Sequence, residues 1–313
     1  MSFDGNENAI NVQTWSEYGK TWFGDNIATT KESVFLEKVI ISVKQAHWSE
    51  LSRIWARWDD NEKILFREVY SDIVELLRVS IDAVVVRVLA ECWNPAYRCF
   101  TFGKVDMTPT LEEYTTPLNI PNIRRHSLYT KAIRPKGFTT KMITLTGKTK
   151  EWVKEYIHDE RISWAQLKSL IYEQTQSKRR RDHFALAVYG LVVFPWKEDH
   201  FDIALIDFVE VISRKTNPAP TIIAKTFLSL NQCRRSGESD FSPLVDFLDK
   251  FQISEHRKRK DWVEALRNIK DTEIVWKAYW LPKEDILYRC GNNSFLMLHE
   301  LWGAVGYTPL IAL

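Results

Sequence analysis

The sequence has little glycine and proline, with eleven of each among 313 residues. Loop-rich and low-complexity chains carry more of both residues. Hydrophobic residues make up 45% of the chain and thirteen residues are tryptophan, which is enough to build a substantial core. The composition therefore predicts a globular, helical protein rather than a disordered one.

Cysteine is scarce as well, at positions 92, 99, 233 and 290. No two of these residues form a C-x-x-C pair, and their spacing does not fit a zinc site. We therefore expect reduced thiols in an intracellular compartment, and no metal or cofactor.

Neither sign of charge is in large excess, since 43 Lys and Arg stand against 41 Asp and Glu, for a formal net charge of +2. Dedicated nucleic-acid binders carry a strong basic excess, so any such contact must be local here. Long hydrophobic runs are also missing, because the longest, residues 184–196, is too short to span a bilayer. The N-terminus lacks a cationic-then-apolar signal. We expect a protein that is neither secreted nor in a membrane.

Residues 1–28 predict a polar N-terminal tail, and residues 29–313 predict one helical domain. Capping residues followed by apolar positions at helical spacing mark the expected helices. These cover residues 29–43, 48–58, 59–76, 82–93, 139–145, 149–158, 163–173, 178–194, 201–212 and 221–230. The buried stripe of the third is expected at Leu65, Val69, Ile73 and Leu76.

A different pattern follows the fourth expected helix. Residues 97–105 are expected to be extended, with Phe100 and Phe102 on one face and Gly103 allowing a tight reversal. Thr108-Pro109 is expected to start the next helix, as its N-cap and first residue. The predicted fold class is a mainly α, multi-helix globular domain with a short β-hairpin-like insertion.

This segment contains a long ungapped string of residues that recurs as a unit in a known family. Its members are Trp93, Asn94, Pro95, Tyr97, Phe100, Phe102, Gly103, Asp106, Pro109, Glu112, Glu113 and Tyr114. The string resembles the signature of the plant mobile domain, in the branch common in plant genomes as a domain of unknown function. Residues 189–195, 231–238, 286–291 and 302–310 resemble the same family, so the resemblance covers about residues 45–313.

The plant mobile domain family is associated with transposable elements. Its domesticated members are nuclear proteins implicated in silencing and genome stability, and some act with a serine/threonine phosphatase-like partner. The resemblance thus implies a nuclear, non-enzymatic protein-interaction module of transposon ancestry, with a phosphatase-like or chromatin protein as partner. A nucleic-acid-binding module of a transposable element is the alternative.

Two features depart from the family pattern. Between Phe241 and Ser242 relatives carry an additional aromatic-rich helical segment, and Pro117 interrupts an expected helix over 110–120. The chain also ends within an apolar run where relatives continue. We therefore expect a shortened copy of the domain.

Several catalytic arrangements are unsupported by the sequence. Gly147-Lys148-Thr149 is read as a helix end followed by an N-cap, because the earlier glycine of a phosphate-binding loop is missing. A transposase nuclease would draw on carboxylates at 106, 202, 207, 210 and 238, but the strands that should present them are absent from the pattern. The name "aminotransferase-like" has been attached to plant mobile domains, yet no α/β scaffold for pyridoxal phosphate is present, and we do not expect that activity.

Local basic clusters are the remaining candidates. Lys178-Arg179-Arg180-Arg181 and Arg234-Arg235 are candidate phosphate or partner contacts, as is the run at residues 256–260. Solvated helix ends are the competing interpretation. Arg234-Arg235 lies in a family-like string and is also interpreted as structural, binding helix C-termini.

Overall fold

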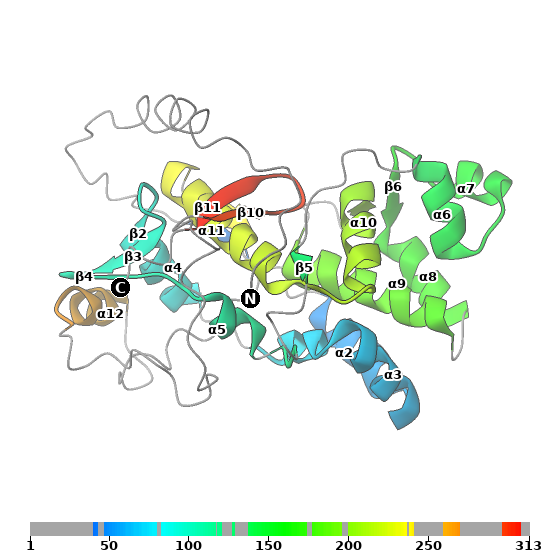
Figure 1. Ribbon diagram of the computed structural model, residues 1–313, viewed down its shortest axis with the longest axis horizontal. Helices are drawn as coiled ribbons and strands as arrows, with labels where there is room; N and C mark the ends of the chain where they lie inside the picture. The colour runs from blue at the N-terminus through cyan, green and yellow to red at the C-terminus, as the bar shows by residue number, and fades with distance from the viewer. Residues whose placement is uncertain are drawn as a thin grey trace.

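The computed structural model describes residues 40–42, 47–79, 83–116, 118–120, 127–128, 137–173, 177–195, 200–236, 238–240, 259–269 and 296–307. Within them the protein is mainly α-helical with short strand pairs, which confirms the predicted fold class (Figure 1). The expected tail at 1–28, the junction at 241–242 and the last residues of the chain lie outside these ranges. In the part of the chain that is described, no helix has the length and apolar character needed to cross a membrane.

The first described helices are α2 (Trp48–Ala56) and α3 (Asp60–Tyr70), followed by a 3₁₀ turn (Ile73–Arg78) and α4 (Ala83–Cys92). The Asp59 side chain caps α3 by accepting from the Glu62 N–H at 2.8 Å, as predicted. The predicted stripe of Leu65, Val69, Ile73 and Leu76 is only partly correct: Ile73 is buried and Val69 and Leu76 pack against the core, but the buried residues of α3 itself are Glu62, Phe66 and Tyr70. Phe66 packs edge-on against Trp58, and this aromatic contact sets the rotation of the helix.

A second correction concerns residues 40–42. They form strand β1 (Ile40–Ser42), which pairs in parallel with β9 (Glu238–Asp240), and not the end of a helix over 29–43. The rest of that expected helix lies outside the described residues. β9 follows α11 (Ala219–Ser236) and presents a backbone edge to the β-branched pair Ile40-Ile41, which suits a strand.

The core is centred on α9 (Lys178–Val188), which continues as a π-helical turn (Tyr189–Val193). Both are buried from His183 onward, as predicted for a central helix. A methyl group on Gly190 would lie 2.5 Å from the Phe201 ring, so glycine permits the close approach of β7 (His200–Asp202). α10 (Ile203–Ile212) packs beside α9.

One end of the molecule is built from α6 (Phe138–Thr146), α7 (Lys150–Tyr156), β6 (Arg161–Ser163) and α8 (Trp164–Glu173) (Figure 1). Gly147 ends α6 in the left-handed conformation at φ +68°, and Thr149 caps α7. The Gly147-Lys148-Thr149 triplet is therefore a helix junction, as predicted. Ser163 and Gln166 form the expected reciprocal cap of α8.

The other end carries a three-stranded antiparallel sheet of β2 (Trp93–Asn94), β3 (Cys99–Phe102) and β4 (Val105–Met107). It is followed by α5 (Leu111–Thr115), and α12 (Arg259–Arg267) lies next to it (Figure 1). Helix α11 contacts α4, α5 and the hairpin of β10 (Leu296–His299) and β11 (Ala304–Tyr307). A short parallel pair joins β5 (Ser127–Leu128) to β8 (Thr216–Asn217).

Candidate functional site

The signature string forms the small sheet and the start of α5. Phe100 and Phe102 are 0% and 1% exposed and stack with ring centroids 5.8 Å apart, whereas Thr101 is exposed. This confirms the predicted alternation of faces. The Thr101 hydroxyl donates to the Asp106 carboxylate at 2.7 Å across the strand pair. Asp106 therefore has a structural partner on the outer face of the sheet.

Trp93 fixes the sheet to α11. Its indole Nε1–H donates to the Asn231 side-chain oxygen at 2.8 Å, and its ring contacts Phe100 and Phe227 at centroid distances of 5.0 and 4.8 Å. Sequence reasoning missed this pair, although both residues lie in strings that resemble the same family. Much of the signature is thus explained by folding.

The start of α5 corrects the expected helix boundary. Thr110, and not Thr108, is the N-cap, and it forms a capping box with Glu113. The Thr108 hydroxyl instead donates to the Arg98 carbonyl oxygen at 3.3 Å, which ties the chain back to the turn before β3. Glu112 and Glu113 lie in the first turn of α5, where negative charge is favoured by the helix dipole.

Tyr114 and Gly103 complete the packing of the signature. The buried Tyr114 hydroxyl donates to Thr226 of α11 at 3.3 Å. Gly103 has φ +63°, and a methyl group there would lie 2.4 Å from the Arg267 carbonyl oxygen at the end of α12. Only glycine satisfies both the left-handed turn and this close approach.

The turn from Pro95 to Tyr97 is a part of the signature that faces solvent. The Asn94 side-chain oxygen accepts from the Ala96 and Tyr97 N–H groups at 3.1 and 3.3 Å, and the Arg98 N–H donates to the Asn94 carbonyl at 2.8 Å. The expectation that Tyr97 begins an extended segment was wrong, because the Asn94 side chain stabilises a turn there. Tyr97 is 56% exposed at the tip. The turn therefore presents an aromatic side chain from a braced backbone.

The basic cluster at the start of α9 is mostly engaged inside the protein. Arg181 Nη1 lies 3.0 and 3.1 Å from the two carboxylate oxygens of Glu62, and the two side chains are only 15% and 5% exposed. The Arg180 guanidinium lies 5.0 Å from the Trp58 ring centroid, at cation–π distance. Lys178 pairs with Asp182 at 2.7 Å. Arg179 is exposed and lies against the backbone of Gly147.

Arg234 and Arg235 lie in the last turn of α11, far along the chain from α9 and on a different element. Arg235 is exposed and Arg234 is half-buried. Both lie where the negative end of the helix dipole stabilises a cation. The run at 256–260 lies outside the described residues except for the backbone of its last two, which open α12.

The described carboxylates among those considered for a nuclease take part in structural contacts. Asp202 caps α10 and accepts from the Trp302 indole at 2.7 Å, while Asp207 pairs with Lys141 of α6. Glu210 pairs with Arg214, and the side chain of Glu238 is not described. Among the described residues, no group of three or more His, Cys, Asp or Glu side chains could hold a metal ion.

The described thiols are not activated. Burial raises the pKa of Cys92 and of Cys99 to about 11, in both cases helped by a nearby carboxylate, Glu91 or Asp106. Burial also raises the pKa of Cys233. These three thiols are therefore protonated at neutral pH, which is the opposite of what a nucleophilic cysteine needs.

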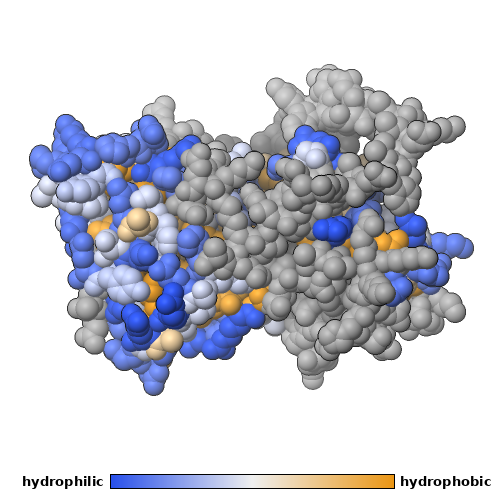
Figure 2. All heavy atoms as spheres, turned by 180° about the vertical axis from the view of Figure 1, so that it is seen from behind, coloured by the Kyte–Doolittle hydropathy of each residue, from blue (hydrophilic) through white to orange (hydrophobic). Residues whose placement is uncertain are grey.

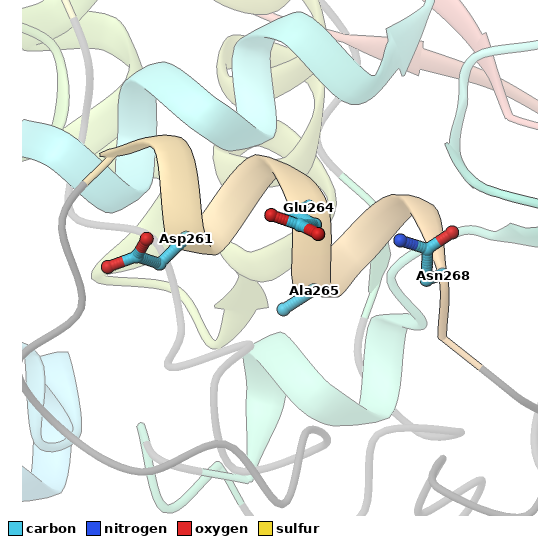
Figure 3. A pocket seen from close by; sticks show the side chains of 4 residues that line it. All are labelled: Asp261, Glu264, Ala265 and Asn268. Carbon is cyan, nitrogen blue, oxygen red and sulfur yellow. The ribbon is translucent and has the colours of Figure 1, made fainter.

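Two open cavities lie on helix surfaces. One, of about 460 Å³, is lined by Asp261, Glu264 and Ala265 of α12 and by Asn268 in the turn that follows (Figure 3). The other, of about 620 Å³, is lined by Asp59, Asn61, Glu62, Leu65 and Arg181. In this second cavity the cation Arg181 is paired with Glu62. The first cavity is lined by residues of α12 and the turn after it. Neither of these cavities therefore brings together unpaired catalytic groups from several of the described elements.

The arrangement defines a mainly helical domain in which a small antiparallel sheet and a C-terminal hairpin pack on one long helix. The model of a family described as a domain of unknown function (DUF7745) matches residues 51–313, so the chain belongs to this family. Neither the curated proteins nor the solved structures contain a match to it.

Proposed function

We propose that the protein is a non-enzymatic protein-interaction module of the plant mobile domain kind, of transposon ancestry, which acts in the nucleus in silencing or genome stability. The proposed partner is a phosphatase-like or chromatin protein. The resemblance of the signature string to that family supports the ancestry and the class of partner.

The observation that carries the proposal is the exposure of Tyr97. Trp93, Phe100, Phe102 and Tyr114 of the same string are at most 1% exposed, so their packing accounts for them. Tyr97 is 56% exposed, and the side chain of Asn94 braces its turn. Tyrosines held in a defined conformation are favoured at the centres of protein interfaces, because little side-chain entropy is lost on binding.

Affinity purification from plant nuclei with the tagged chain tests the proposal. We expect a phosphatase-like or chromatin protein to be recovered with the natural sequence and lost with Tyr97→Ala. For the purified pair, loss of a central tyrosine should weaken binding by about 30-fold or more, equivalent to roughly 2 kcal/mol. Substitution of Trp93 or Phe102 is unsuitable, since both are buried and their loss would unfold the sheet.

Tyr172 provides the matched control. It is a similarly exposed tyrosine, at 47%, on helix α8 at the other end of the molecule. Tyr172→Ala should leave recovery of the partner unchanged. Equal loss with both variants, or no loss with Tyr97→Ala, would remove the basis for an interface at this turn.

Nucleic-acid binding is the second candidate, and the exposure of Arg179 and Arg235 favours it. Binding through phosphates would weaken with rising salt, and Arg179→Glu or Arg235→Glu would reduce the slope of that dependence. Arg181 is excluded from such a test because Glu62 binds it. Undetectable DNA and RNA binding at low salt would end this alternative.

A further inference from the structure

His183 occupies an unusual position in α9. Its side chain is 0% exposed, and its Nε2 atom lies 2.9 Å from the carbonyl oxygen of Leu145 in the last turn of α6. The other ring nitrogen, Nδ1, is buried and has no hydrogen-bond partner among the described residues. This arrangement suits a neutral ring that carries its proton on Nε2 and donates it to Leu145.

The bond lies at the junction between α6 and α7. Gly147 ends α6 two residues after Leu145, and the exposed Arg179 lies over that glycine, one helical turn before His183. Met142, one turn before the end of α6, is fully buried. The contact between α6 and α9 therefore combines apolar packing with the buried hydrogen bond between His183, a titratable side chain, and the Leu145 carbonyl oxygen.

Apolar burial of Phe138, Val153 and Ile157 also holds α6 and α7 to the core. Their polar ties to the protein lie closer to the surface. Lys141 of α6 pairs with Asp207 of α10, and Lys148 pairs with Glu173 at the end of α8 at 2.7 Å. The Gln166 side chain of α8 donates to the Tyr156 carbonyl at the end of α7. Opening of the pair must therefore reverse the burial of His183 together with that of these apolar side chains.

The charged groups around His183 do not offset its burial. Burial lowers its pKa most, and Arg179 lowers it further, while the Leu145 carbonyl, Asp182 and Glu173 raise it. Asp182 is occupied by Lys178 and by the Tyr70 hydroxyl, and Glu173 is occupied by Lys148. On α10, Asp207 is committed to Lys141.

We propose that His183 is an acid-sensitive latch: its neutral ring holds the α6–α7 helix pair against α9, and protonation of the ring releases the pair locally while the rest of the core stays folded. A second proton would place a buried N–H at Nδ1, where the described part of the chain offers no acceptor. In the open state the imidazolium is hydrated, so acid favours opening.

Hydrogen exchange measured by mass spectrometry tests the latch. Peptides within 138–157 report on α6 and α7, and peptides within 219–236 report on α11 as a reference. In the open state we take His183 to have the ordinary histidine pKa of about 6.5. Lowering the pH from about 7.5 to about 5.5 then raises the equilibrium constant for opening by at most about tenfold. We expect a several-fold increase in opening of α6–α7 after correction for intrinsic exchange, and no comparable change in α11.

Two variants separate the latch from general acid effects. His183→Gln keeps an N–H that can donate to Leu145 but cannot titrate, so opening should become independent of pH. His158→Gln removes an exposed histidine just after α7 and should behave like the natural sequence. Persistent pH dependence in His183→Gln, or its loss in His158→Gln, would overturn the proposal.

A measurement on the natural sequence covers the case in which His183→Gln folds poorly. The ring proton resonances of His183, followed by NMR, should titrate below the ordinary histidine range, and the backbone amides of α6 should shift over the same pH interval. Titration of the ring with no response in α6 would show that the histidine is buried without acting as a latch.

Discussion

The indole N–H of Trp93 donates to the side-chain oxygen of Asn231 at 2.8 Å, and this bond joins β2 to a helix 138 residues further along the chain. Trp93 is 1% exposed, so its indole N–H has little access to water. Asn231→Ala leaves a buried donor without a partner and should lower the free energy of unfolding by about 1–3 kcal/mol.

A double-mutant cycle with Trp93→Phe checks this bond in urea titrations. Trp93→Phe should cost more than Asn231→Ala, because it loses packing against Phe227 as well as the donor. The Asn231→Ala cost should be smaller in the Trp93→Phe background, since no donor is then left unsatisfied. Additive costs would mean that the bond contributes nothing.

Gly103 gives a second prediction, since its backbone lies at φ +63° and any side chain would meet the Arg267 carbonyl. Gly103→Ala should cost about 1–2 kcal/mol for the left-handed conformation alone, with a further cost from displacing α12. Gly137→Ala is the control, because a methyl group there meets nothing within 4 Å. Thermal unfolding should show a clear loss of stability for Gly103→Ala and a change within about 1 kcal/mol for Gly137→Ala. Equal effects of the two substitutions would contradict the contact with α12.

Local signals predicted much of the fold. The caps at Asp59, Thr149 and Ser163 involve residues three positions apart, and each lies where the spacing indicated. The strand at 40–42 was missed because its partner, β9, lies almost 200 residues away, and no local pattern in the sequence encodes that pairing.

Long-range pairing also limits how much of the candidate site was predictable. Arg181 and Glu62 are 119 residues apart, so the sequence alone presented Arg181 as one member of a basic run. Tyr97, which lies in the turn after Asn94, was read as the start of an extended segment, because the alternating aromatic residues that follow dominate the pattern there. The helix junction at Gly147, by contrast, depends only on its immediate neighbours and was predicted.

The Glu62–Arg181 pair yields a third prediction. Arg181→Met leaves the carboxylate of Glu62, which is 5% exposed, without its partner. Loss of one member of a buried pair costs roughly 3–5 kcal/mol. Arg179→Met, two residues earlier and exposed, should cost less than about 1 kcal/mol. Chemical denaturation of both variants checks this, and comparable stabilities would indicate that Arg181 is hydrated like its neighbour.

Glu300 should make stability fall as pH rises. Its side chain is 3% exposed in the turn between β10 and β11, where it accepts from the Trp302 N–H at 2.8 Å. Burial raises its pKa, partly offset by that bond and by Lys225. Because the folded state holds the proton of Glu300 more tightly than the unfolded state, the contribution of this carboxyl to stability is fully present below about pH 4.3 and is lost as pH rises through the folded pKa.

Glu300→Gln cannot titrate and can still accept from Trp302, so relative to the natural sequence it should gain stability between about pH 4.5 and pH 7. Urea midpoints at the two pH values measure this difference, with Glu155→Gln, an exposed carboxylate on α7, as the control. If the natural sequence and Glu300→Gln changed in parallel with pH, the carboxyl would have to be ionised and solvated in the folded protein, contrary to its burial.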